Sequence, residues 1–343
     1  MMRWIAAAVI AFLVALPFLL LPIYFLHLLI LVLMWSFIGT SWALMGRFGL
    51  VSLGHGGFMG VGVYTSALVW NFAGLTPWLG IPLGIVLALV LAFAVGYPAF
   101  RFRVMGHYFA LVTLALGEVV RLSIIAARDY TGGSLGMTPN PIQPATPVSW
   151  YALQFADKRF FYFIALAVWL LGLHVYDRVS RGMPRAALEA ISEDEVAAAS
   201  VGIRVTRHKL RITLISAGMT ALGGILLGQY NQYLNPNSLS GIAISLDIVF
   251  SAIVGGMYSL PGPTVGALLT ILFRESLRTF FGVKLIGMAE TIYGLLLIVF
   301  IIFMPRGIYG TLADRLTRSA PPSAPPTASP PLPPREADPA PSA

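Results

Sequence analysis

The chain has 343 residues, of which 57% are apolar and only 10% are charged, and its mean hydropathy is +0.82. Because soluble globular domains carry roughly 25% charged residues, this composition excludes an ordinary soluble domain and indicates an integral membrane protein in contact with lipid. The net charge of +8 comes from basic residues in short segments between apolar runs, without an aromatic-interleaved basic face, so we expect no nucleic-acid partner.

The N-terminal apolar run continues to residue 45 without a small-residue cleavage site, which argues against a signal peptide. At 1.5 Å per residue this run is far longer than a bilayer core of about 30 Å, so it should hold two membrane spans. Pro17 and Pro22 mark the expected break between them.

Apolar runs further along the chain predict eight more spans. We expect them at about 56–72, 78–100, 108–126, 160–176, 212–229, 241–256, 264–280 and 285–304. The sequence therefore predicts an all-α polytopic membrane protein with about ten transmembrane helices.

Lysine and arginine residues fall mainly on one side of this layout. With residue 1 in the cytoplasm, the outer segments hold Arg128, Lys158, Arg159, Arg274, Arg278 and Lys284. The cytoplasmic segments hold Arg3, Arg47, Arg101, Arg103, Arg178, Arg181, Arg185, Arg204, Arg207, Lys209, Arg211, Arg306, Arg315 and Arg318. This positive-inside bias is typical of multi-pass membrane proteins and predicts that both termini are cytoplasmic.

The composition changes abruptly near residue 313. Ser, Ala and Pro repeat from there to residue 343, a pattern that cannot form a helix or bury a core. We therefore divide the chain into a transmembrane domain, 1–312, and a Pro-rich disordered cytoplasmic tail, 313–343.

One charged segment interrupts the apolar sequence, at about 184–203. Ser192 and Glu195 have the spacing of a capping box, Gly202 suits a helix stop, and Pro184 lies where a helix tolerates proline best. Thr206 is expected to cap the following span. The pattern predicts one or two short amphipathic helices on the cytoplasmic side.

This segment carries more apolar surface than a solvated loop helix needs. Small alanine side chains also allow another protein to approach closely, so we favour a helix that docks a partner over a loop helix without one. The residues expected to couple the chain to that partner are Glu189, Ile191, Glu193, Asp194, Glu195, Ala197, Ala198 and Gly202.

A glycine-rich segment around Gly54, Gly56 and Gly57 opens the third expected span. Gly56 and Gly60 have the small-x-x-x-small spacing that lets helix backbones pack closely. The alternative is an unwound segment that lines the translocation pathway. His55 has no second histidine at a metal-ligand spacing, so we expect a hydrogen-bonded packing residue and no metal site.

Ionisable residues inside the other spans are few. Glu118 and Arg121 share a face of the fifth span with Thr113, and we favour a mutual ion pair that fixes helix packing over substrate contact. Asp247 lies midway along the eighth span, where it is expected to cap a broken half-helix or, alternatively, to face the translocation cavity.

Motifs for chemistry are absent from the sequence. There is no cysteine and no phosphate-binding loop of the Gly-x-x-x-x-Gly-Lys-Ser/Thr type. We expect no catalytic residue and no cofactor in this chain, and energy for any transport must then come from another subunit.

The charged segment resembles the docking signature of ABC-importer permeases, in which Glu-Ala-Ala and a later Gly precede Ile-x-Leu-Pro. The corresponding residues are Val196, Ala197, Ala198, Gly202, Ile212, Leu214 and Ile215. Val196 stands in place of the family's Glu, and Ile215 in place of its Pro.

Further stretches across about 25–310 resemble LivM-type permeases, the membrane subunits of branched-chain (hydrophobic) amino acid ABC importers. They are GLVSLGHGGFMGVGVYTSAL (49–68), GHYFALVTLALGEVVRL (106–122), YTGGSLGM (130–137), AISEDEVAAASVGI (190–203), VGGMYSLPGPTVGALL (254–269) and FMPRGIYG (303–310). Tyr258 departs from the glycine found in many relatives.

The resemblance implies a division of labour. A second, related permease subunit would complete the pathway, two cytoplasmic ATPases would hold ATP and Mg²⁺, and an external binding protein would deliver branched-chain amino acids. Related permeases move other amino acids, urea or small carboxylates. An ion-coupled secondary transporter using Glu118, Asp247 and Glu290 is an alternative from another class, and an intramembrane enzyme ranks last.

Overall fold

The computed structural model describes residues 2–19, 22–141 and 148–281, with short stretches between 291 and 311. Its long helices are α1 (Met2–Ala15), α2 (Ile23–Gly46), α3 (His55–Ala73), α4 (Pro77–Arg101), α5 (Gly106–Ala126), α7 (Lys158–Arg181), α10 (Val205–Asn231), α12 (Gly241–Gly255) and α13 (Gly262–Phe281). Short elements connect them: η1 (Leu16–Phe18), α6 (Arg128–Thr131), η2 (Gly133–Leu135), α8 (Met183–Glu193), α9 (Glu195–Ser200), α11 (Pro236–Leu239) and an antiparallel pair, β1 (Val148–Ser149) with β2 (Gln154–Phe155).

Each span predicted before residue 282 appears as a helix. Six helical segments among the described residues are long and apolar enough to cross a membrane: α2, α4, α5, α7, α10 and the α11–α12 stretch. The protein is therefore a multi-pass membrane protein. Helix α1, the first predicted span, has 14 residues and a length of about 21 Å, which is shorter than a bilayer core of about 30 Å. The expected tenth span (285–304) and the Pro-rich tail (313–343) lie outside the described residues.

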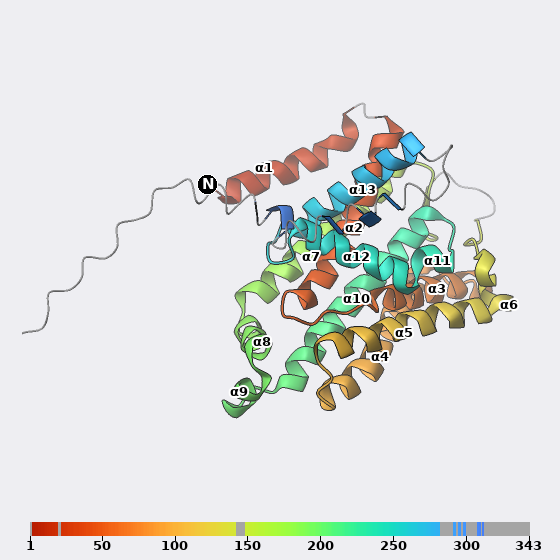
Figure 1. The fold of residues 1–343 in the computed structure, drawn as a ribbon. Helices are drawn as coiled ribbons and strands as arrows, with labels where there is room; N and C mark the ends of the chain where they lie inside the picture. Colours follow the sequence, from red (N-terminus) through yellow and green to blue (C-terminus); the bar gives the residue numbers. More distant parts are fainter. Residues whose placement is uncertain are drawn as a thin grey trace, which may run out of the picture.

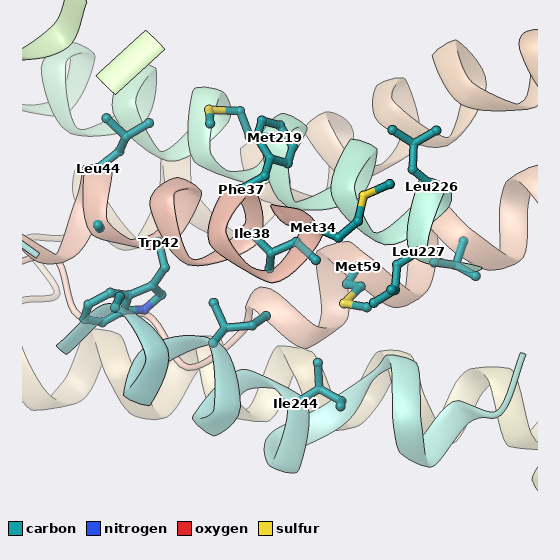
Figure 2. Close-up of a cluster of buried hydrophobic side chains, with 14 of the residues drawn as sticks. Met34, Phe37, Ile38, Trp42, Leu44, Met59, Met219, Leu226, Leu227 and Ile244 are labelled. Atoms are coloured by element: carbon teal, nitrogen blue, oxygen red, sulfur yellow. The ribbon is translucent and has the colours of Figure 1, made fainter. Parts of the chain in front are cut away.

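Helices α2 and α10 form the centre of the bundle. In α10, 67% of an apolar 18-residue stretch is buried inside the bundle. The same fraction is 28% in α4 and in α5, so the outer faces of these two helices are available for contact with lipid. Met34, Phe37 and Ile38 of α2 lie between α10 and α12 (Figure 2). A helix that is apolar on all sides, as α2 is, is stable in such an enclosed position.

Glycines let α3, α4 and α10 approach closely. A Cβ atom added to Gly84 of α4 would lie 2.7 Å from the carbonyl oxygen of Gly62 in α3. One added to Gly62 would lie 3.1 Å from the Cα atom of Ala221 in α10. Backbone contact of this kind is the usual way in which membrane helices gain packing energy without a hydrophobic driving force.

The connecting segments gather at two ends of the bundle. At one end, α8 and α9 lie beside the first turns of α10, and α9 also faces the last turn of α4 across a cavity (Figure 1). Arg47 Nη1 donates to Ser180 Oγ there at 2.7 Å, and the Tyr176 hydroxyl donates to the carbonyl oxygen of Met257 at 2.7 Å. We call this the α8–α9 end.

The opposite end collects the remaining connections. Asn71 Nδ2 donates to the carbonyl oxygen of Thr138 at 2.9 Å, and the Met137 amide donates to that of Leu234 at 2.9 Å. The described loops thus alternate between the two ends, as expected if each span crosses the membrane once, and the assignment of one end to the cytoplasm stays a prediction.

A pair of glycines in α4 tests the packing described above. Gly84→Ala should destabilise the protein by about 1 to 3 kcal/mol, because backbone atoms of α3 occupy the space that the methyl group needs. Gly96→Ala is the matched control, since its nearest neighbour is 3.5 Å away and alanine favours helix by about 1 kcal/mol. Thermal unfolding in detergent should therefore rank Gly84→Ala below wild type and Gly96→Ala at or above it, and the reverse order would contradict this packing.

Candidate functional site

The charged segment forms two helices, α8 and α9, that meet at Asp194. Asp194 Oδ1 accepts hydrogen bonds from the amides of Val196 at 2.7 Å and Ala197 at 3.0 Å, so Asp194 is the N-cap of α9. The prediction of a capping box that begins at Ser192 is wrong, because α8 continues through Glu193 and holds Ser192 in its last turn. The chain bends only at Asp194, whose backbone is extended.

The end of α9 matches the prediction for Gly202. This glycine has φ +88°, a left-handed conformation that favours glycine, and its amide donates to the carbonyl oxygen of Ala199 at 3.0 Å. The Ile203 amide donates to the carbonyl oxygen of Ala198 at 3.1 Å. The expectation that Thr206 caps the next helix is wrong, since α10 begins after Arg204 without a side-chain cap.

The expected coupling residues divide between two faces of this α8–α9 segment (183–204). Ile191 and Ala198 are buried together with Leu188 and fix the segment to the bundle. Glu189, Glu193, Asp194, Ala197 and Gly202 are exposed. Because Val196 and Val201 are 70% and 77% exposed as well, the outer face combines apolar and acidic groups in the way that a docking surface does.

Glu195 differs from the other acidic residues of the segment because it forms a largely buried ion pair with Lys209 of α10, whereas the Glu189–Arg185 pair is exposed. The Lys209 side chain is only 7% exposed and that of Glu195 18%. The ammonium group also lies 5.8 Å from the centre of the Phe100 ring in α4, within the range of a cation–π contact. Buried lysine is rare unless paired, so this interaction holds α9, α10 and α4 together.

A cavity of about 340 Å³ lies beside the ion pair. Residues 48–50 of the α2–α3 loop, 104–106 of the α4–α5 loop and 191–196 of the α8–α9 segment line it, with Lys209 at its edge. The α8–α9 segment therefore lies next to two other connections at the same end of the bundle.

His55 begins α3 inside the bundle and is fully buried. Its Nε2 atom lies 2.8 Å from Ser216 Oγ in α10, and Ser216 in turn donates to the carbonyl oxygen of Ser41 at 2.6 Å. Because a hydroxyl has one proton, Ser216 accepts from His55 here, and Nε2 carries the imidazole proton. The ring joins α2, α3 and α10, and the residues that the structure describes hold no group of three or more acidic or histidine side chains suited to a metal ion.

The expected glycines bring α3 against α5 and α12. The Gly56 amide donates to Ser245 Oγ at 2.9 Å, and a Cβ atom on Gly57 would lie 3.1 Å from the Cα atom of Gly117. A Cβ atom on Gly54 would meet the Thr113 backbone, and the Leu53 amide donates to Thr113 Oγ1 at 3.0 Å. The amides of Leu53 and Gly54, in the irregular chain before α3, thus have hydrogen-bond partners inside the bundle.

Glu118 and Arg121 of α5 form the expected ion pair, with Arg121 Nε at 2.9 Å from Glu118 Oε1. Arg121 also donates to Asn237 Oδ1 of α11 at 2.9 Å. The guanidinium group thereby fixes α5 to the connection that precedes α12.

Asp247 does not cap a half-helix, contrary to the prediction. It lies in the middle of the continuous helix α12 and pairs with Arg274 of α13, with 2.7 Å between Oδ1 and Nη2. An aspartate in the interior of a helix has no free backbone amide within reach to cap. The positive charge that compensates Asp247 comes from Arg274 on another helix, a contact that the sequence alone did not predict.

The bundle of long apolar helices, its paired intramembrane charges and its polar segment at one end define a multi-pass helical membrane protein. The chain belongs to the family described as branched-chain amino acid transport system, permease component, whose model matches residues 24–304.

Individual relatives agree with this family. The chain is 30% identical to the high-affinity branched-chain amino acid transport system permease protein LivM of Salmonella typhimurium and 31% identical to LivM of Escherichia coli, in each case over 77% of this chain and 64% of the relative. It is 25% identical to LivH of Escherichia coli over 80% of this chain and 92% of LivH. The match thus spans somewhat less than two thirds of the LivM relatives, and no solved structure matches the chain.

The Glu195–Lys209 ion pair can be tested without a transport assay. Glu195→Gln should increase amide hydrogen exchange across 194–204, because removing one partner of a buried pair costs about 3 to 5 kcal/mol. Glu193→Gln makes the same chemical change on an exposed side chain and should leave exchange unchanged. A double variant, Glu195→Gln/Lys209→Met, should recover part of the protection.

Equal exchange in the Glu195 and Glu193 variants would show that the pair does not hold the segment.

Proposed function

We propose that this chain is the membrane-spanning subunit of an ATP-driven ABC importer for branched-chain amino acids in a bacterial plasma membrane. The observation that supports this most strongly is the family match across 24–304. Named relatives are high-affinity branched-chain amino acid permease proteins, and the multi-pass helical bundle agrees with that role.

The α8–α9 segment is the proposed docking site for a cytoplasmic ATPase. Its buried residues attach it to the bundle, and its outer face offers alanine and valine side chains beside acidic groups. Lys and Arg gather at this end of the bundle, which favours a cytoplasmic location. Each of two ATPases would hold ATP and Mg²⁺, and this chain would supply no catalytic group.

A mechanical path runs from this surface into the membrane. A displacement of α9 acts on α10 through the Glu195–Lys209 pair, and α10 is the most enclosed of the candidate spans. His55 and Ser216 then connect α10 to α3, where the glycines Gly54, Gly56 and Gly57 lie. ATP-driven closure of the ATPases would thus reach helices that border the translocation pathway.

The remaining partners follow from the family and the named relatives. The chain resembles both LivM and LivH, so we propose that a related but distinct permease subunit completes the pathway. An external binding protein would deliver the solute and set most of the specificity. The alternative within the same class is that this chain is a permease of the same family for another small solute, such as urea, another amino acid or a small carboxylate.

The intramembrane charges favour packing over ion coupling. Glu118 is paired with Arg121, and Asp247 with Arg274, so two of the three carboxylates that an ion-coupled transporter would use have a basic partner. Glu290, the third carboxylate of that alternative, lies outside the described residues. We therefore propose that Thr113, Glu118, Arg121 and Asp247 position helices, and that energy comes from the ATPases.

The docking proposal predicts the effect of one exposed substitution. Charge reversal at Asp194 or Glu195 would disturb the cap or the ion pair, so a surface position is the sharper test. Val201→Asp should reduce co-purification of the ATPase subunits and ATP-dependent uptake by at least tenfold, since a charge placed in a packed interface commonly costs more than 1.4 kcal/mol.

Leu135→Asp is the matched control, because Leu135 is 72% exposed at the opposite end. It should leave ATPase co-purification unchanged. Full ATPase binding by Val201→Asp would rule out docking at this surface.

The substrate assignment has its own test. Purified cognate binding protein should bind leucine, isoleucine or valine in calorimetric titrations, and energised proteoliposomes should accumulate the same amino acid. Binding only of urea or a carboxylate would change the solute while retaining the transporter.

A further inference from the structure

A second cavity at the α8–α9 end borders α9, and the function proposed above does not use the arginines that line it. It has a volume of about 660 Å³ and lies between the end of α4, the α9 helix and the start of α10. Its polar lining includes four arginines, Arg101, Arg103, Arg204 and Arg207. Glu195 also borders it, but its charge is compensated by Lys209.

The four arginines have no acidic partner in the part of the chain that the structure describes. No described ion pair or side-chain hydrogen bond involves their guanidinium groups, whereas Arg121, Arg159, Arg181, Arg185 and Arg274 are paired. All four are exposed. Concentrated, unpaired guanidinium groups around a cavity favour an anionic ligand with oxygen acceptors.

The other wall of the cavity is apolar and continues onto the membrane face of α4. Phe93 and Tyr97 line it, are 49% and 44% exposed, and stack with their ring centres 5.5 Å apart. Only 28% of an apolar 18-residue stretch of α4 is buried against the rest of the bundle. A ligand here therefore meets arginines at the end of the helix and aromatic rings along its lipid-facing side.

We propose that this cavity binds an anionic phospholipid of the cytoplasmic leaflet. The phosphodiester lies among the arginines, and an acyl chain lies along Phe93 and Tyr97. Basic pockets between membrane helices on the cytoplasmic side are suited to such headgroups. The proposal rests on the cytoplasmic placement of the α8–α9 end, and it makes α9 and its ion pair neighbours of a bound lipid.

The test uses the complete transporter complex in nanodiscs with equal amounts of phosphatidylglycerol and phosphatidylcholine. Intact-complex mass spectrometry should show selective retention of phosphatidylglycerol by the wild-type protein. Arg101→Gln/Arg204→Gln should weaken this retention roughly 30-fold, which corresponds to about 1 kcal/mol for each charge removed.

Arg178→Gln/Arg211→Gln is the matched control, since both residues are exposed at the same end and neither lines the cavity. This variant should retain phosphatidylglycerol as the wild type does. Equal retention by both double variants, or equal loss in both, would overturn the lipid site.

Two further readouts separate the lipid from other ligands. Displacement of phosphatidylglycerol by inorganic phosphate would identify a site for a free anion and overturn the proposal. Loss of the ATPase subunits from Arg101→Gln/Arg204→Gln with full lipid retention would identify the arginines as a partner surface, which also overturns it. Since Val201→Asp tests ATPase docking separately, failure of the lipid site leaves the importer proposal standing.

Discussion

The ion pair between Glu195 and Lys209 is the contact on which the arrangement of the α8–α9 end depends. An ammonium group that is 7% exposed beside apolar helices needs a compensating charge, and Glu195 supplies it from a separate helix. The pair fixes where α9 begins relative to α10, and it leaves Glu193, Ala197 and Val201 on the outer face. The ion pair thereby attaches the short polar segment to the membrane domain.

In the proposed mechanism, a displacement of α9 reaches the interior of the bundle through closely packed helices. Glycines remove the side-chain layer between α3, α4 and α10, and the His55–Ser216–Ser41 chain of hydrogen bonds joins α3, α10 and α2. Close-packed interfaces transmit strain because they have few voids to absorb it. The charged pairs Glu118–Arg121 and Asp247–Arg274 add fixed points toward the opposite end, so they are structural in the same sense.

The sequence predicts the described long helices well, because a helix that crosses a bilayer needs a long apolar run. It also predicts the Gly202 stop and the Glu118–Arg121 pair, which are local in the chain. The sequence misplaces the N-cap of α9 at Ser192. Ser192 and Asp194 are both suitable N-cap residues, and Asp194 takes this role because α8 extends to Glu193. The partners of Asp247 and Lys209 come from other helices, and no local pattern identifies them.

The orientation of the α8–α9 end is the central claim, and the chain's lack of cysteine makes it directly measurable. Val201→Cys and Leu135→Cys place single thiols at positions that are 77% and 72% exposed at the two ends. A membrane-impermeant maleimide added to intact spheroplasts should label Leu135→Cys, and it should label Val201→Cys only in inside-out vesicles. Labelling of Val201→Cys from the outer side would place the proposed docking surface away from any cytoplasmic ATPase and contradict the account.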